Sequence, residues 1–123
     1  MAITKGNQDV FASQTVSSGS SETSSWIDLT EKQAATLLGD ITNGGSGPSS
    51  QPTVTIQVAD DNSGTNTRTV EEFETPTDNS AVTPFEYRFP ITTRFARVTV
   101  DNTGGGGNDI TVDANLQTVD ALG

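Results

Sequence analysis

The fold of this chain is decided by the stretch Arg94-Phe-Ala-Arg-Val-Thr-Val-Asp-Asn-Thr-Gly-Gly-Gly-Gly-Asn-Asp-Ile-Thr-Val112. Apolar and polar residues alternate on both sides of the glycine run, which indicates strands with one buried face. The inward residues are predicted to be Ala96, Val98, Val100, Ile110 and Val112. We expect the loop Gly104–Gly107 to be too flexible for a rigid hairpin turn, because each glycine costs entropy to order. The stretch therefore predicts a β protein with long loops.

The same period of two marks strands elsewhere in the chain. The clearest is Pro52–Ala59, where valine and isoleucine face inward and threonine and glutamine face outward. Phe85–Phe89 alternates aromatic and charged residues and ends at Pro90. The other predicted strands are Val10–Val16, with Val10, Ala12 and Val16 on one side, Ser25–Leu29, with Ile27 and Leu29 opposite Trp26, and Thr67–Glu74. The segments between them, Ser17–Ser25 among them, are rich in Ser, Gly and Pro, which is typical of loops.

One segment, Thr30–Thr42, admits two interpretations. Thr30 and Gln33 resemble a helix capping box, and the alanines and leucines that follow could continue a helix to Gly39. Alternatively, a short helical turn at Glu31–Gln33 leads into a strand through Ile41. Strands on both sides of the segment favour the second interpretation.

These elements predict an all-β fold, a single antiparallel β-sandwich of jelly-roll type with seven or eight strands. The length of 123 residues suits one domain, residues 1–123. The stretch Met1–Gln8 has no evident place in a sheet, so we expect it to form a short N-terminal arm. The predicted core between the sheets is Val54, Ile56, Val58, Ala96, Val98, Val100, Ile110 and Val112.

Charge limits the partners of this protein. Sixteen acidic residues against six basic ones give a net charge of -10, which disfavours nucleic acid and anionic membranes because both require clustered Lys and Arg. No apolar stretch approaches the roughly 20 residues of a membrane span, and the start of the chain lacks an apolar signal core. Few lysines and many Asp and Thr are typical of proteins from extreme halophiles. A mesophilic extracellular β domain is the alternative.

The residues needed for most catalysis are missing. The chain has no His and no Cys, which removes the commonest general base and every thiolate. A carboxylate pair remains conceivable in Glu71, Glu72 and Glu74, but a solvated strand face explains that run better. We expect no enzyme activity, no catalytic residues and no cofactor.

A turn after the strand Pro52–Ala59 offers oxygen ligands. Calcium prefers six to eight oxygens, so Asp60, Asp61 and Asn62 are the candidates for a calcium site. The spacing does not match an EF-hand, because Gly64 stands fifth rather than sixth from Asp60. We favour a plain turn and expect no bound metal.

Aromatic and basic residues are the candidates for contacts with other proteins. Trp26 and the stripe of Phe85, Tyr87 and Phe89 could stack on a sugar, but a stripe of period two is explained more simply by a core. Half of the basic charge lies within ten residues, between Arg88 and Arg97. The predicted interface residues are Arg88, Arg94 and Arg97, with Ile3 and Lys5 from the arm. A pair within the fold, such as Arg88 with Glu86, is the alternative for the arginines.

Three segments in order carry a resemblance: Ser24-Ser-Trp-Ile-Asp-Leu29, Thr53-Val-Thr-Ile-Gln-Val-Ala-Asp-Asp61 and Arg94-Phe-Ala-Arg-Val-Thr-Val100. This layout resembles small jelly-roll proteins of tailed-virus particles, namely capsid decoration, turret and fibre-tip modules. It is also similar to discoidin-like carbohydrate-binding modules. The resemblance covers most of residues 24–113 and assigns no binding residue.

The resemblance to virus-particle proteins implies a function. We expect a non-enzymatic virion structural protein, a capsid decoration protein of a tailed virus that binds and stabilises the capsid. Its partners would be the major capsid protein or other virion proteins and further copies of itself, as a trimer, and the acidic composition suggests a haloarchaeal host. The alternative is a carbohydrate-binding or host-adhesion module of a tail fibre.

Overall fold

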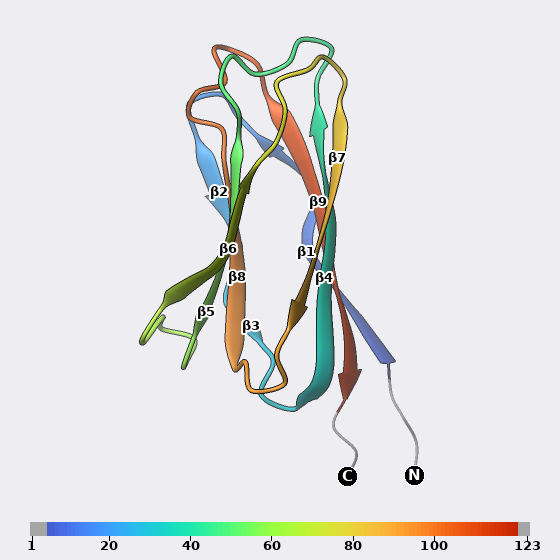
Figure 1. Cartoon of the computed structure of the whole chain (residues 1–123), viewed down its shortest axis with the longest axis vertical. Helices are drawn as coiled ribbons and strands as arrows, with labels where there is room; N and C mark the ends of the chain where they lie inside the picture. Colours follow the sequence, from blue (N-terminus) through green and yellow to red (C-terminus); the bar gives the residue numbers. More distant parts are fainter. Residues whose placement is uncertain (1–4, 121–123) are drawn as a thin grey trace.

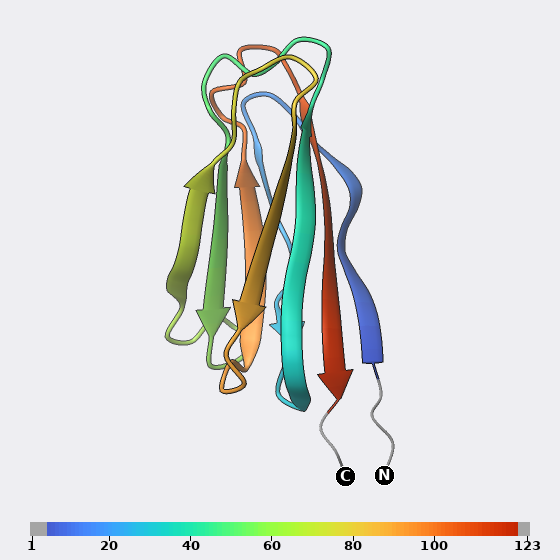
Figure 2. The same ribbon diagram turned by 45° about the vertical axis from the view of Figure 1, so that its right-hand side comes forward.

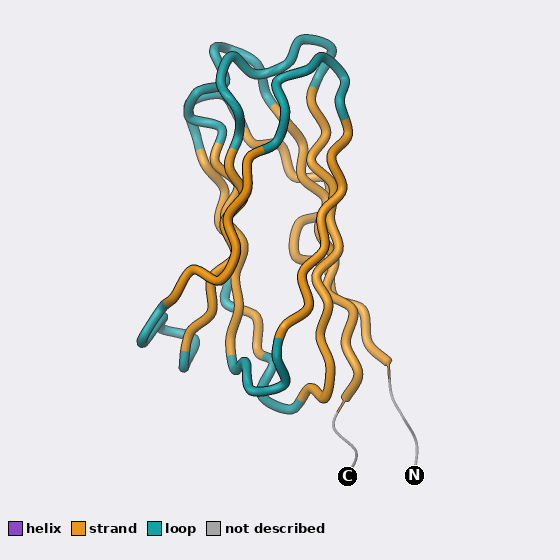
Figure 3. Tube along the Cα trace, viewed as in Figure 1, coloured by secondary structure: helices purple, strands orange, loops and turns teal. Residues whose placement is uncertain are grey.

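Two antiparallel sheets face each other across one hydrophobic core (Figure 1). The computed structural model describes residues 5–120, and no helix forms within that range (Figure 3). The strands are β1 (Lys5–Val16), β2 (Ser21–Thr23), β3 (Ile27–Asp28), β4 (Lys32–Asn43), β5 (Thr53–Ala59), β6 (Arg68–Glu74), β7 (Val82–Phe89), β8 (Phe95–Asp101) and β9 (Ile110–Asp120). The predicted all-β sandwich is confirmed.

The strand order identifies the sandwich as a jelly roll. One sheet, called sheet A, has the order β1-β9-β4-β7, and the other, sheet B, has the order β2-β8-β5-β6 with β3 also paired to β8. If β2 and β3 are counted as one strand, each strand along the chain lies in the opposite sheet from the strand before it. The one exception is β6, which follows β5 within sheet B. This is the arrangement of two interleaved Greek keys. It places the β8–β9 loop across the top of the sandwich rather than in a hairpin (Figure 2).

The nine segments correspond to eight jelly-roll strands, because β2 and β3 are one interrupted strand beside β8. At the interruption, the Ser24 amide donates to the Val98 carbonyl (2.9 Å) and the Val98 amide donates to Ser24 Oγ (3.0 Å). A side-chain hydroxyl thus replaces a backbone acceptor for one residue. The sequence analysis placed Ser21–Thr23 in a loop, because a short edge strand made only of polar residues shows no alternation of apolar and polar residues.

The predicted core is confirmed. The inward residues of β5, β8 and β9 are buried, and only Val58 is partly exposed while still packing against the cluster. The register explains this, since Val54, Ile56 and Val58 of β5 lie opposite Val100, Val98 and Ala96 of β8. The other buried members of this core cluster are Phe11, Val16, Ile27, Leu29, Ala35, Leu37, Ile41, Phe89, Ala114 and Leu116.

Strand β1 differs from its prediction in extent and in phase. Lys5–Gln8 pair with β9, so the expected arm does not extend over these four residues, while Met1–Thr4 lie outside the described residues. The register shifts twice between Asp9 and Gln14. A bulge changes which side chains face inward, and accordingly Phe11 is buried while Ala12 is exposed.

The segment Thr30–Thr42 follows the second interpretation in its main feature. Thr30 and Glu31 form a turn without a helix, and β4 begins at Lys32 and continues to Asn43. Pairing on both sides, with β9 and β7, outweighs the helix propensity of its alanines and leucines. Similarly, β9 continues beyond the predicted Val112 to Asp120.

The outer strands are poor templates for further pairing. Strand β1 carries two bulges, β7 contains Pro84, and the β2/β3 edge is short and interrupted. Strand β6 carries three glutamates. Each of these features discourages edge-to-edge association. Contacts with other molecules are therefore expected on the sheet faces and loops.

Candidate functional site

A groove of about 840 Å³ crosses sheet A and is lined by residues of all four of its strands. Leu37 and Ile41 of β4 are buried in the core, so the alternating residues Leu38 and Asp40 lie on the outer face of the sheet. Register places Asn115 opposite Leu38, and Pro84 opposite Asp40. The groove thus lies on the side of sheet A that no other part of the described chain covers.

Four carboxylates surround this groove, those of Asp9, Asp40, Glu86 and Asp113. Asp40 and Asp113 are direct register partners on neighbouring strands, an arrangement that destabilises a sheet when the charges are alike. The Asp113 carboxylate accepts hydrogen bonds from the Ser13 amide (2.7 Å) and hydroxyl (3.1 Å). Ser13 has a positive φ of 48°, so the bulge in β1 is what brings these donors to Asp113.

The outer face of sheet B carries a polar row across its strands. Arg97 of β8 donates from Nε to Gln57 Oε1 of β5 (2.8 Å), and its guanidinium lies 4.3 Å from the centre of the Trp26 ring. Gln57 reaches Thr69 of β6 at 3.4 Å. Gly64 of the β5–β6 loop also lies against the indole, where an added Cβ would be 3.3 Å from it. Trp26 is therefore a structural contact that joins this loop to the sheet.

The predicted interface arginines do not come together. Arg88 lies on the outer side of sheet A and pairs with Glu86 at 3.4 Å, whereas Arg97 lies on the outer side of sheet B. Arg94 is exposed in the β7–β8 connection, and Lys5 is exposed at the start of β1. Ile3 lies outside the described residues. Because β7 and β8 belong to different sheets, closeness in sequence does not become closeness in space.

The aromatic stripe of β7 packs inward, as its period of two indicates. Phe89 is buried, while Phe85 and Tyr87 are half-buried and pack against the core. Phe85 contacts Phe73 with ring centroids 5.4 Å apart, and Tyr87 contacts Phe89 at 4.9 Å. Phe85 also covers Gly39, where any Cβ would overlap its ring. The stripe is not available as a flat platform for a sugar.

The Asp60–Asn62 turn uses its carboxylates to hold its own backbone. Asp61 Oδ1 accepts from the amides of Ser63 (3.0 Å) and Thr65 (3.1 Å), and Asp60 Oδ2 accepts from Asn66 Nδ2 (2.7 Å). The hydrogen bonds from Thr65, and then from Ser63, hold the pKa of Asp61 below its ordinary value. Nowhere in residues 5–120 do three or more His, Cys, Asp or Glu side chains gather as a metal site.

The glycine loop connects two strands of different sheets and is not a hairpin turn, as expected, and it packs against a second loop. The amides of Ser49 and Ser50 donate to the carbonyls of Gly105 (3.1 Å) and Gly104 (2.8 Å). A Cβ on Gly104 would lie 2.6 Å from that of Ser50, so the close approach of the two loops requires glycine. The glycines serve backbone packing between the β4–β5 and β8–β9 loops.

Asparagine side chains tie the loops at this end of the sandwich to one another. Asn102 Nδ2 donates to the carbonyls of Val16 (3.1 Å) and Asn108 (3.0 Å), and Asn108 Nδ2 donates to Gly47 (2.9 Å). Buried Asn43 donates to Pro76 and Asp78, both at 2.8 Å. Four loops therefore form one cap over the core, which we call the loop cap: β1–β2 (residues 17–20), β4–β5 (44–52), β6–β7 (75–81) and β8–β9 (102–109).

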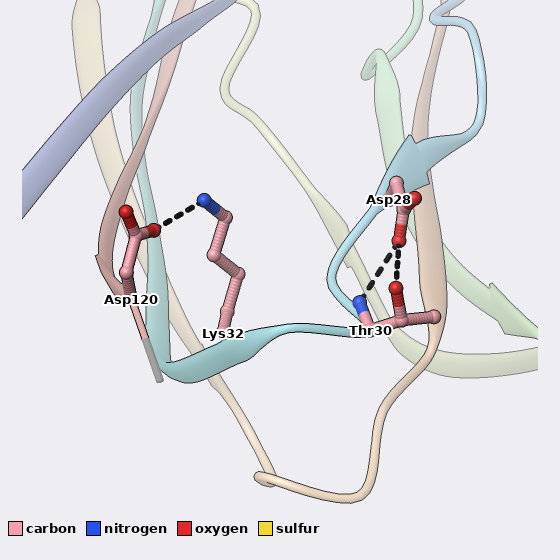
Figure 4. A network of polar contacts seen from close by, with 4 residues as sticks. All are labelled: Asp28, Thr30, Lys32 and Asp120. Atoms are coloured by element: carbon pink, nitrogen blue, oxygen red, sulfur yellow. Dashed lines mark hydrogen bonds and ion pairs between the residues drawn. The ribbon is translucent and has the colours of Figure 1, made fainter. Parts of the chain in front are cut away.

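The opposite end holds two smaller polar contacts (Figure 4). Asp28 accepts from the Thr30 hydroxyl (2.6 Å) and amide (2.9 Å), which lowers the pKa of Asp28. Lys32 at the start of β4 pairs with Asp120 at the end of β9. These contacts fix the turn into β4 and the end of β9.

The whole chain lacks His and Cys, so a Ser–His or Cys–His pair cannot form. Residues 5–120 also form no helix with the length and hydropathy that a membrane crossing requires. What the sequence analysis missed is the groove, because Asp40 and Asp113 become neighbours only through strand register. The alternation of Ile110, Val112, Ala114 and Leu116 was a signal that β9 continues as a long strand.

No protein family and no curated protein matches the chain by sequence. Solved structures are similar to it in fold. A chain of the infectious bursal disease virus VP2 subviral particle is 16% identical with a TM-score of 0.60, covering 97% of this chain and 33% of that chain. The PBSX exported protein XepA is 11% identical with a TM-score of 0.60, covering 96% and 38%.

A family 16 carbohydrate binding module is 13% identical with a TM-score of 0.51, covering 80% of this chain and 70% of that one. The chain spans about a third of the length of the viral chains it matches. Identities this low show a common fold and nothing finer. That fold, over nearly all of this chain, occurs in virus-particle proteins.

Proposed function

We propose that this chain is a non-enzymatic structural protein of a virus particle. The observation that carries the proposal is the strand order of the two sheets, β1-β9-β4-β7 against β2/β3-β8-β5-β6. The similarity to virus-particle chains covers 97% of the sequence, and so it extends well beyond a local motif. The edge strands are poor templates for pairing with strands of another molecule, so the sheet faces and the loop cap remain as contact surfaces. This suits a protein that binds others through rigid surfaces.

Within that class, the proposal is a decoration protein on the capsid of a tailed virus, located in the virion. Its partners are the major capsid protein or other virion proteins, together with further copies of this chain as a trimer. Its loop cap is held by backbone and asparagine hydrogen bonds, which gives the fold a defined surface for contact with the capsid. The acidic, lysine-poor composition supports a haloarchaeal host, because high salt screens the self-repulsion of the protein.

Mass spectrometry of particles banded in a density gradient tests this function. Trypsin should release the peptide of residues 69–88, because Arg68 and Arg88 precede its two cleavage points. The proposal expects this peptide in the particle band at a constant ratio to the major capsid protein. Mild stripping that removes the chain and leaves the capsid intact would support decoration. Finding the chain only in the soluble fraction would contradict any virion role.

The second candidate function is a carbohydrate-binding or adhesion module of a tail fibre. The similarity to the family 16 carbohydrate binding module favours it, since the match covers 70% of that chain. Against it, Arg97 lies over Trp26 and the β7 aromatics pack inward. Affinity electrophoresis in gels that contain xylan, mannan or starch separates the two functions. Retardation that Trp26→Ala abolishes would favour the carbohydrate module.

A further inference from the structure

The groove on sheet A combines an apolar floor with an acidic rim. The apolar side chains on its floor are those of Ala12, Leu38 and Pro84. It runs across all four strands, a distance of about 14 Å at a strand spacing of about 4.8 Å. An extended peptide rises about 3.3 Å per residue, so about five residues would cross the groove.

The charge of the groove is one-sided. Four of its described lining residues are acidic and none is basic. Asp40 lies directly opposite Asp113, and no hydrogen bond to the Asp40 carboxylate is present among residues 5–120. Arg88 reaches Glu86 at 3.4 Å from beside the groove, but its side chain is 82% exposed, so this ion pair is weak. The repulsion between Asp40 and Asp113 is therefore only poorly offset within the described chain.

The occupant that fits this surface carries positive charge and apolar groups together. A second copy would bring a further net charge of -10 toward the groove, which low ionic strength would oppose. A single metal ion would leave the apolar floor uncovered. Lysine and arginine side chains can place their charged ends at the carboxylates and their methylene stems along the floor.

We propose that the groove binds an extended segment of a partner protein in which basic and apolar residues alternate. Asp40 and Asp113 contact its cationic groups on the rim, and Leu38 and Pro84 form the surface under its apolar side chains. This proposal does not depend on the virion role, because the partner need not be a virion protein. Particle mass spectrometry tests the virion role and the peptide experiment below tests the groove, so a negative result in one leaves the other proposal standing.

The probe is a fluorescently labelled peptide of sequence Lys-Val-Lys-Val-Lys, and binding is followed by fluorescence anisotropy with the whole chain. The expected result is saturable binding that weakens strongly between 0.05 and about 1 M NaCl. A peptide of sequence Gln-Val-Gln-Val-Gln with the same label should bind much more weakly. These two peptides separate charge recognition from simple contact with an apolar floor.

The variant Asp40→Asn/Asp113→Asn removes two rim charges and keeps the oxygen that accepts from Ser13. We expect its affinity for the lysine peptide to fall at least about fivefold, as two exposed charge pairs allow. The matched control is Glu71→Gln/Glu74→Gln on β6, which removes the same charge from the edge of the other sheet. Its affinity should stay within about twofold of the original protein.

Each other outcome overturns the proposal. Equal losses in both double variants would show attraction to the overall charge alone. Calorimetric binding of calcium at 1 mM that the lysine peptide cannot displace would make the groove a cation site. Self-association that only the groove variant abolishes would make it an interface between copies. If the double variant does not fold, Asp40→Asn alone gives the same test, and an unchanged affinity there refutes the assignment.

Discussion

Asn102 is the residue whose replacement should report most clearly on the loop cap. The residue is 1% exposed, and its side-chain Nδ2 donates to the carbonyls of Val16 and Asn108. In the isosteric variant Asn102→Asp, a carboxylate would face two carbonyl oxygens. Burial among acceptors favours the neutral acid, which raises the pKa of the introduced group.

The magnitude follows from the two donors that Asn102 provides. A protonated Asp keeps one donor, so about 1 kcal/mol is lost with the other hydrogen bond. Holding the acid neutral at pH 7, against an unfolded pKa of about 3.9, costs up to about 4 kcal/mol at about 1.4 kcal/mol per pH unit. The free energy of unfolding should therefore fall by up to about 5 kcal/mol at pH 7. Because the folded pKa is raised, the part of about 4 kcal/mol vanishes below the unfolded pKa and grows as the pH rises, whereas the part of about 1 kcal/mol from the lost hydrogen bond remains at low pH.

Urea denaturation measures this change, with Trp26 fluorescence as the signal because it is the only tryptophan in the chain. The difference from the original protein should shrink by up to about 3 kcal/mol between pH 7 and pH 5. The control is Asn62→Asp, which adds the same charge at an exposed turn and should stay within about 0.5 kcal/mol. Equal stability of the two variants at pH 7 would refute the role of Asn102, and so would a difference that does not change with pH.

Three further predictions concern the core, the charge and the β5–β6 turn. Val98→Asp places an unpaired charge in the core and should lower the free energy of unfolding by at least about 3 kcal/mol; an unchanged melting temperature would show that the inward face is wrongly assigned. Raising NaCl from 0.1 to 1 M should raise the melting temperature, because the screening length falls from about 10 to about 3 Å; a flat response would remove the halophile argument. Asp61→Ala removes the acceptor that serves Ser63 and Thr65 and should destabilise the protein above about pH 4. Since the pKa of Asp61 is lowered by folding, that difference should shrink as the pH falls through its folded value, and thermal melts at several pH values would show whether it does.

The sequence predicted the strands whose alternation is regular. Pro52–Ala59 and Arg94–Val100 formed β5 and β8 nearly as expected, and their inward residues make the core. Alternation failed in β1, because bulges between Asp9 and Gln14 shift the phase. It also could not show β2, whose residues are held by pairing with β8 rather than by their own burial.

The candidate site was less accessible from sequence. The arginines at 88, 94 and 97 form a cluster in the sequence, but the jelly roll sends β7 and β8 to different sheets. Asp40 and Asp113 are far apart in the sequence, and only the β4–β9 register makes them neighbours. The packing of the glycine loop could not be predicted either, because a run of glycines gives no sign of the second loop against which it lies. These features depend on contacts between residues far apart in the sequence, which local patterns of apolar and polar residues do not predict.

The virion role itself is tested most directly by cryo-electron microscopy of purified particles whose protein content includes this chain. The account predicts density on the capsid surface into which the two-sheet jelly roll fits, with neighbouring density against a sheet face or the loop cap. Particles of the same stock that lack such density, with the chain recovered only as free protein, would contradict it.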